Sequence, residues 1–255
     1  MPERPPSGSP RPGSSTLLSA TALIAAAGSG ERLGAGGAKA FVDLAGRPLL
    51  DHSLAAIAAS ETLTEVVIAA PSADRRRAHE LLAGHAGLSG EVVEGGATRA
   101  ESVARALTAV HGKLVLVHDA ARPLAPPALF DAIVARLGAE KGADAVVAAA
   151  PIADTVKRSR EPHDDAALGI VASTVSRDDL WIAQTPQGFR VERLRAAQRR
   201  AEEAGELAAA TDEAGLIEAG GGIVLLERSP ASNIKVTDAA DLRLAGALLA
   251  GSGRV

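Results

Sequence analysis

Short apolar runs of strand length alternate along this chain with segments of helical periodicity, and this alternation constrains the fold more than any other feature. We expect strands at 22–27, 65–70, 91–94, 114–118, 145–150 and 222–227. We expect helices at 48–59, 101–110, 127–137, 191–204 and 238–249, the first with Pro48 in its first turn. Regular alternation predicts an α/β fold with a Rossmann-like, mostly parallel sheet and helices on both faces. Ligands of such sheets bind at the carboxyl ends of the strands.

The length of 255 residues suits one large domain, which we place at 20–251. Residues 1–19 are rich in Pro, Ser and Gly, so we predict a disordered tail and no secretion signal. Segment 152–177 breaks the strand and helix pattern with Asp, Arg, Pro and His. We interpret it as a protruding β-arm that serves dimerisation; the alternative is a mobile surface loop, although long loops without a role are uncommon.

Composition excludes several classes of function. Acidic and basic residues are interspersed at a net charge of −4, so no basic field favours nucleic acid or an anionic membrane. The chain has no cysteine, which rules out disulfides, thiolate zinc sites and a cysteine nucleophile, and its six histidines lack ligand spacing. No apolar run is long enough to span a bilayer. We therefore predict a cytoplasmic protein with neither nucleic acid nor membrane as a partner.

The glycine-rich segment 25–39, AAAGSGERLGAGGAK, follows the first expected strand and carries two cations, Arg32 and Lys39. Glycines let backbone N–H groups converge on an anion, and the cations can neutralise neighbouring phosphates. We predict a polyphosphate site, although a lone glycine-rich turn is also common as an ordinary loop. Leu33 stands where a dinucleotide fingerprint needs glycine, and no Ser or Thr follows Lys39 as in a P-loop.

A second candidate site lies at 115–123, where an apolar strand ends in Asp119 and is followed by Arg122 and Pro123. A carboxylate at a strand end beside a phosphate loop is a natural ligand for Mg²⁺, which completes its coordination with phosphates and water. Asp119 could equally cap a turn, and Arg122 could be a surface ion-pair partner. His118 is interpreted as a partly buried structural residue and not as a base.

The third candidate is 94–102, EGGATRAES, at the end of another expected strand. Glycines there can bring backbone groups close to a flat base, and Ser102 can donate and accept hydrogen bonds. The same residues also fit a helix start, with Thr98 as N-cap and Glu101 three residues later in a capping box. Both interpretations can hold together. Four later segments, 154–158, 184–189, 210–213 and 233–237, each place Thr, Lys or Arg near a turn.

Taken in order, these segments resemble the 2-C-methyl-D-erythritol 4-phosphate cytidylyltransferase family over about residues 21–249. The resemblance implies a nucleotidyltransferase fold of the GT-A-like kind. It implies transfer of a cytidylyl group from CTP to 2-C-methyl-D-erythritol 4-phosphate, which yields 4-diphosphocytidyl-2-C-methyl-D-erythritol and pyrophosphate in non-mevalonate isoprenoid biosynthesis. A pentitol-phosphate cytidylyltransferase, such as one using ribitol 5-phosphate, is the nearest alternative. A non-catalytic nucleotide-binding regulatory subunit is a second.

The resemblance also implies roles for individual residues. The catalytic cations would be Arg32, Lys39 and Lys235, and Asp119 would hold Mg²⁺. The nucleotide would lie against Ala26, Ala27, Gly28, Ser29, Gly30, Gly96, Ala97, Ser102 and Ala120. The sugar-alcohol phosphate would lie among Arg122, Thr155, Arg177, Thr185 and Thr211. Thr155 and Arg177 would reach across a homodimer interface from the arm, with Arg122 a further candidate for that reach.

Two departures from the family pattern stand out. Ala38 replaces the usual proline before the loop lysine, which predicts a looser loop. Ala97 and Ser232 replace acidic residues near the base and before Asn233. Since backbone groups can still recognise the base, we expect activity to survive both departures.

Overall fold

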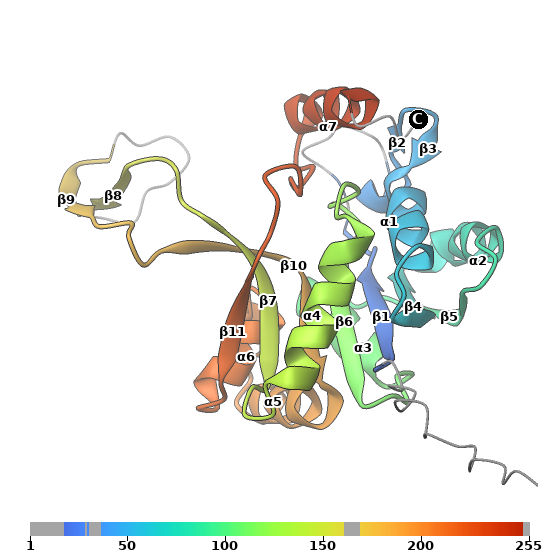
Figure 1. Cartoon of the computed structure of the whole chain (residues 1–255), viewed down its shortest axis with the longest axis horizontal. Coiled ribbons are helices and arrows are strands. Elements are labelled where there is room, and N and C mark those ends of the chain that lie inside the picture. The colour runs from blue at the N-terminus through green and yellow to red at the C-terminus, as the bar shows by residue number, and fades with distance from the viewer. Residues whose placement is uncertain (1–17, 29, 31–36, 161–168, 252–255) are drawn as a thin grey trace, which may run out of the picture.

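The computed structural model describes residues 18–28, 30, 37–160 and 169–251. Its centre is a seven-stranded sheet of order β11-β7-β10-β6-β1-β4-β5 (Figure 1). The strands of this sheet are β1 (Ala20–Ala25), β4 (Leu63–Ala70), β5 (Ser89–Glu94), β6 (Leu114–Asp119), β7 (Ala145–Pro151), β10 (Trp181–Arg190) and β11 (Val224–Arg228). All six expected strands are present, and none of their ends is shifted by more than two residues.

The sheet is mostly parallel, as predicted. β1 pairs in parallel with both β4 and β6, β4 with β5, and β7 with β11. The exception is β10, which runs antiparallel between β6 and β7. Strand β10 was not predicted from the sequence, because its residues, WIAQTPQGFR, contain no continuous apolar run. Its pairing with β7 is interrupted between Ala183 and Gln187, where a bulge turns side chains out of the regular ladder.

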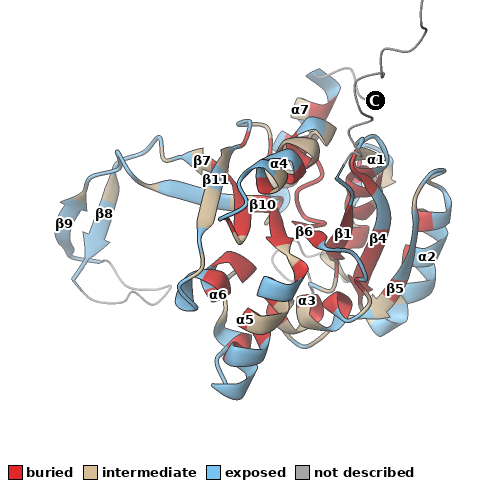
Figure 2. Cartoon of the chain, turned by 60° about the horizontal axis from the view of Figure 1, so that its bottom comes forward, coloured by how far each residue is buried: buried red, intermediate tan, exposed pale blue. Residues whose placement is uncertain are grey.

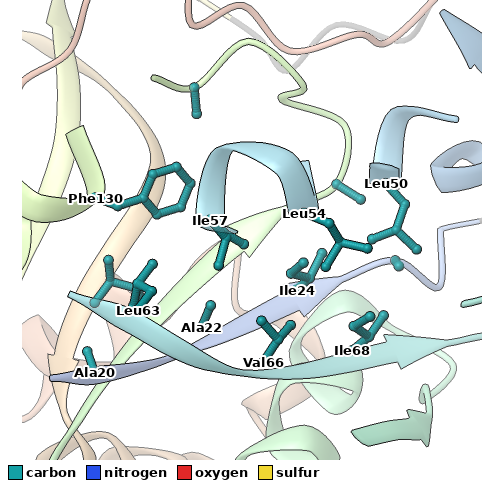
Figure 3. Close-up of a cluster of buried hydrophobic side chains, with 14 of the residues drawn as sticks. Ala20, Ala22, Ile24, Leu50, Leu54, Ile57, Leu63, Val66, Ile68 and Phe130 are labelled. Carbon is teal, nitrogen blue, oxygen red and sulfur yellow. The ribbon is translucent and has the colours of Figure 1, made fainter. Parts of the chain in front are cut away.

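Helices cover both faces of the sheet, as the alternation predicts. On one face lie α1 (Leu49–Ala58), α2 (Arg75–Ala83) and α4 (Pro127–Ala139), whose apolar side chains share a core with alternate residues of β1 and β4. On the other lie α3 (Arg99–Leu107), α5 (Val191–Glu203) and α6 (Glu213–Ala219), which pack on Leu23, Val67 and Val117. Figure 3 shows the first core, with Leu54 and Ile57 of α1 above Ile24 and Val66.

Some helix boundaries differ from the sequence expectations. Pro48 is not in the first turn of α1: it ends the short strand β3 (Arg47–Pro48), which pairs with β2 (Asp43–Leu44), and it is the N-cap residue. Helix α3 starts two residues earlier than expected, at Arg99. Helices α2 and α6 were not expected. Only Ala78 and Leu82 of α2 are buried, so its sequence has little apolar periodicity to detect.

The C-terminal helix α7 (Ala239–Gly251) closes the domain over the β2–β3 hairpin. Ala245 and Leu249 of this helix form a small separate core with Leu44, Leu49 and Val236. The packing anchors the segment 233–237, which precedes α7, close to the strand ends where the candidate site lies. No helix in the described part of the chain is long and apolar enough to cross a membrane.

The expected β-arm is confirmed. Strands β8 (Val156–Ser159) and β9 (Val171–Val175) form an antiparallel two-stranded sheet of their own, which projects away from the domain (Figure 1). Figure 2 shows that buried residues concentrate in the central strands, whereas the arm is almost wholly exposed. Apolar side chains on and beside the arm are among the exposed ones: Ile170, Val171, Trp181 and Ile182.

Candidate active site

A cavity of about 360 Å³ opens at the carboxyl ends of β1 and β6, the edge that the sequence predicts for ligands. These strands are neighbours, with Ala25 paired to Asp119 and the N–H of Ala120 donating to the carbonyl of Ala25 at 3.2 Å. Most of the predicted nucleotide and phosphate residues line this cavity: Ala26, Ala27, Gly28, Lys39, Gly96, Ala97, Ser102, Asp119, Ala120 and Lys235. Of the remaining predicted residues, Ser29 and Arg32 lie outside the described residues, and Gly30 is beside the cavity but not part of its lining.

The loop after β1 is closed by Lys39. Its N–H donates to the carbonyl of Gly28 at 3.0 Å, and its Nζ donates to the carbonyl of Val236 at 2.9 Å. The backbone bond returns the chain to the strand end, and the side chain joins the loop to the segment before α7. Ala38 has φ −63°, the value that a proline ring imposes, so alanine keeps the backbone geometry of the usual proline here.

The loop between β5 and α3 packs directly on the loop after β1. A Cβ at Gly95 would lie 2.4 Å from the Cβ of Ala27, so the approach requires glycine. Ser102 is buried, and its hydroxyl accepts from Gly96 N–H and donates to the carbonyl of Thr98, both at 2.9 Å. Ser102 therefore lines the cavity chiefly as the residue that shapes the loop.

The predicted helix cap at Thr98 is confirmed. Its side chain accepts from the N–H of Glu101 at 3.2 Å. Glu101 does reach back, as a capping box requires, but it accepts from the N–H of Ala97 at 2.8 Å and not from the cap residue itself. The two bonds hold the 96–98 backbone against the cavity, which is the position expected for a segment that contacts a base.

Asp119, the predicted metal ligand, lies between two cations. Its Oδ1 accepts from Arg99 Nε and its Oδ2 accepts from Lys235 Nζ, each at 2.8 Å. Burial raises the pKa of Asp119, but the charges and hydrogen bonds of Arg99 and Lys235 outweigh burial and hold the pKa far below its ordinary value. The carboxylate is therefore ionised across the physiological range.

Asp119 is also the one carboxylate among the described residues that line this cavity, and no group of three potential metal ligands occurs in the described part of the chain. A protein-only metal cage is thus absent from these residues. Mg²⁺ commonly uses one or two carboxylates and takes its other ligands from phosphates and water. The donor set is compatible with Mg²⁺ on these terms, and Asp119 is the residue that would hold the ion.

Sequence reasoning assigned no role to Arg99, although this residue is central to the site. Its Nη1 donates to both carboxylate oxygens of Glu213, at 3.0 and 2.8 Å, while its Nε binds Asp119. Burial lowers the pKa of Arg99, and the two carboxylates raise it by more, so the guanidinium is permanently charged. In the sequence Arg99 is indistinguishable from any exposed arginine in a first helical turn, because its partners are distant along the chain.

A second cavity of about 220 Å³ adjoins the first and shares Arg99, Asp119 and Lys235 with it. Its other lining residues come from the segment after β6, from the β10 bulge and from the residues just before α6: Arg122, Ala183, Gln184, Thr185, Gln187, Thr211 and Asp212. Three of them, Arg122, Thr185 and Thr211, are predicted acceptor residues. Two cavities that meet at two cations and a carboxylate can hold two phosphate compounds with their charged groups together.

The family model for 2-C-methyl-D-erythritol 4-phosphate cytidylyltransferase matches residues 20–251. The chain belongs to this family. It is 46% identical over 231 residues to the enzyme of that name from Frankia casuarinae, a match that covers 90% of this chain and 80% of the relative. The enzyme of that name from Deinococcus radiodurans is 44% identical over 227 residues, covering 89% and 88%.

Solved structures of the family agree with the fold. The 2-C-methyl-D-erythritol 4-phosphate cytidylyltransferase from Thermus thermophilus superposes with a TM-score of 0.71 at 36% identity, covering 91% of this chain and 98% of that one. The 4-diphosphocytidyl-2C-methyl-D-erythritol synthase from Anaerococcus prevotii gives 0.76 at 29% identity, covering 91% and 96%. The family and the nucleotidyltransferase fold predicted from the sequence are confirmed, and the chain is an enzyme of the nucleotidyltransferase class.

Thr185 is one of the residues predicted to bind the sugar-alcohol phosphate, but its hydroxyl already has partners within the protein. Its Oγ1 accepts from the N–H of Asp119 at 3.0 Å and lies 3.2 Å from His118 Nδ1. It thereby fixes the end of β6. His118 is fully buried, packs edge-on against Phe130, and has a pKa lowered by burial to about 4, so its ring is neutral. The structural role predicted for His118 is confirmed, but its burial is complete and not partial as expected.

Arg122 is not a surface ion-pair partner, because it is buried and donates from Nη1 to the carbonyl of Asn233 at 2.7 Å. It lies in the second cavity of its own chain. Thr155 and Arg177 line neither cavity. Both are exposed on the arm, where Arg177 donates to the carbonyl of Ala153. Within one chain the structure therefore gathers every described acceptor residue except these two.

Proposed function

We propose that this chain transfers a cytidylyl group from CTP to 2-C-methyl-D-erythritol 4-phosphate, producing 4-diphosphocytidyl-2-C-methyl-D-erythritol and pyrophosphate for isoprenoid biosynthesis in the cytoplasm. The supporting observation is the junction of the two cavities at Arg99, Asp119 and Lys235. The larger cavity, between the glycine-rich loop and the 95–98 loop, would hold CTP. The smaller one, with Arg122 and Thr211, would hold the acceptor.

The proposed step is an in-line displacement. A phosphate oxygen of the acceptor forms a bond to the α-phosphorus of CTP, and the bond from that phosphorus to the oxygen bridging to the β-phosphate breaks. Pyrophosphate leaves with the electron pair. The nucleophile is already anionic, so no general base is required, and a neutral, fully buried His118 is consistent with this. Positioning and charge neutralisation by Lys39, Lys235 and Arg32 would lower the barrier, the role of Arg32 being the one that the family resemblance implies.

We also propose Mg²⁺ as the cofactor, held by Asp119. When bound, the ion would neutralise phosphate oxygens and favour departure of pyrophosphate. Lys235 binds the Asp119 carboxylate at 2.8 Å, so a substrate phosphate beside it would draw the ammonium away from the carboxylate.

The decisive assay is pyrophosphate release from CTP with each candidate sugar phosphate. Turnover with 2-C-methyl-D-erythritol 4-phosphate at a kcat/KM well above that with ribitol 5-phosphate supports the proposal. The reverse order assigns the chain to pentitol-phosphate cytidylyl transfer, which the same cavities could perform. CTP binding without release of pyrophosphate from any acceptor would identify a regulatory subunit.

Base selection should favour cytosine over purines. The base would lie against Gly95, Gly96 and Ser102, where the loop backbone is held by short hydrogen bonds and a Cβ at Gly96 would lie 2.4 Å from the Cβ of Glu101. A rigid, close wall disfavours the larger purine ring. We expect kcat/KM for CTP to exceed that for ATP or GTP by at least about 10²-fold, measured with one acceptor at fixed concentration. A preference for ATP or GTP would contradict cytidylyl transfer.

We further propose a homodimer whose arms complete the acceptor sites. Thr155 and Arg177 are exposed on the arm, and so are the neighbouring apolar residues Val171 and Ile182, 53% and 50% exposed. Exposed apolar side chains distributed along a projecting element favour burial against a second copy. Trp181, the one tryptophan of the sequence, lies at the arm base and is 38% exposed, so its fluorescence should shift on dilution if subunits dissociate.

Subunit mixing tests the shared site. Arg177→Ala should raise KM for the sugar phosphate and leave CTP binding nearly unchanged, because a bidentate guanidinium suits a phosphate monoester. Arg177→Ala mixed one to one with Lys39→Ala should regain about a quarter of wild-type activity, since half of the dimers would each contain one intact site. The assay uses sugar phosphate well below the KM of Arg177→Ala. Proven subunit exchange without regained activity, or a fully active monomer in sedimentation, would contradict the shared site.

A further inference from the structure

The two cations that hold Asp119 are anchored very differently. Arg99 donates to Asp119 from Nε and to both oxygens of Glu213 from Nη1, and its side chain is 26% exposed. Lys235 binds Asp119 from a side chain that is 40% exposed. A guanidinium fixed between two carboxylates has little freedom to leave, whereas an ammonium on a flexible, partly solvated stem can exchange its partner. Asp119 thus has one fixed and one exchangeable cation.

The buried ion pair between Glu213 and Arg99 is expected to contribute little net stability to the fold. The Glu213 carboxylate is 1% exposed, and the desolvation of a buried ion pair generally offsets most of the attraction between its members. Burial raises the pKa of Glu213, and the charge and hydrogen bonds of Arg99 oppose that rise. Glu213 is in the first turn of α6, after the N-cap Asp212, a position where the helix dipole also favours a negative charge. The main effect of the pair is therefore to fix the position of the Arg99 guanidinium.

That geometry links the two cavities. Arg99 lines both of them, at the first residue of α3, while its anchor Glu213 directly follows Thr211 and Asp212 of the second cavity. Glu213, Arg99, Asp119 and Lys235 form a chain of alternating charge, with links of 2.8 Å. Any movement of Arg99 would move Asp119 relative to both cavities.

We propose that Arg99 is a positioning residue, which Glu213 holds in place so that Asp119 stays fixed between the two cavities when Lys235 leaves it for a substrate phosphate. This inference rests on the proposed function. Without Glu213, the guanidinium would be free to follow Lys235 and pair with the triphosphate of CTP. Binding of CTP would then persist or tighten, while Asp119 would lose its fixed partner during the reaction.

Glu213→Gln tests this, because the amide has nearly the size of the carboxylate but lacks its charge. We expect kcat to fall about 10- to 100-fold, the range seen when residues that orient a ligand-binding side chain are lost. KM for CTP should remain within about threefold or decrease. Calorimetric titration of CTP without metal should give an unchanged or higher affinity. A merely structural defect would instead raise KM, weaken CTP binding and lower the melting temperature.

Three further variants make the result decisive. Arg193→Gln removes an ion pair of 2.9 Å with Asp144, which lies just before β7, at the opposite end of the sheet's strands from the cavities. This variant should leave kcat unchanged. Arg99→Gln with Glu213→Gln should be no slower than Arg99→Gln alone, because Glu213 acts through Arg99. If Glu213→Gln does not fold, Arg99→Lys carries the test, since lysine keeps the charge but lacks the fork that bridges two carboxylates; it should show the same selective loss of kcat.

Two outcomes would overturn the proposal in an active wild-type enzyme. One is a normal kcat in Glu213→Gln or, where that variant does not fold, in Arg99→Lys. The other is additive loss in the double variant. An inactive wild-type protein would instead refute the proposed function, so the two failures are distinguishable.

Discussion

Replacing Asp119 with asparagine should reduce kcat by about 10³-fold, the upper end of the loss seen when a single charge-stabilising group is removed. The carboxylate separates Arg99 from Lys235, with each cation at 2.8 Å. A neutral amide would leave the two cations facing each other without an anion and would remove the protein ligand that we propose for Mg²⁺. Initial rates of pyrophosphate release with saturating CTP and acceptor measure the effect.

Asp131→Asn is the matched control for this variant. Asp131 on α4 also accepts several hydrogen bonds, including 2.6 Å from Ser60 and 2.8 Å from Thr62, but it lines neither cavity. Its replacement should lower the melting temperature and leave kcat within about twofold. Wild-type activity of Asp119→Asn would refute the role of the carboxylate. Full wild-type activity in excess chelator would refute the magnesium requirement alone.

Those parts of the fold that depend on local apolar patterns were predictable. β1, β4, β6 and β7 are buried on both faces, which is why their sequences are continuous apolar runs. Where burial is partial the pattern weakens, and prediction fails: α2 buries two residues, and β10 contains Gln184, Thr185 and Gln187 because its bulge turns toward the second cavity. The failure at β10 thus marks a segment whose sequence serves the site and not the core.

The site was predictable to a similar extent. Glycines after β1 and β5, the cap at Thr98 and the acid at the end of β6 are local signals, and the structure gathers them around one cavity. The partners of these residues are not local. Arg99 and Glu213 are 114 positions apart, and Lys235 and Asp119 are 116 apart. Only the order of strands in the sheet brings such pairs together. Local patterns therefore pointed to Asp119, the family resemblance added Lys235, and neither indicated Arg99.

The ammonium of Lys39 should act mainly on the transition state, and Lys39→Ala should lower kcat by about 10²- to 10³-fold with little change in KM for CTP. Two hydrogen bonds, to the carbonyls of Gly28 and Val236, place this residue at the cavity before any ligand binds. A pre-positioned cation stabilises the extra negative charge that develops on the α-phosphoryl oxygens during attack without having to reorganise.

Lys113→Ala is the control for Lys39→Ala. Lys113 is an exposed lysine just before β6, at the opposite end of this strand from the cavity. It should retain wild-type kcat and KM. Single-turnover rates at saturating CTP distinguish a slower chemical step from weaker binding. If Lys39→Ala reaches the wild-type rate once CTP is raised, the lysine contributes to binding alone. A loss that persists at saturation means that Lys39 acts on the chemical step itself.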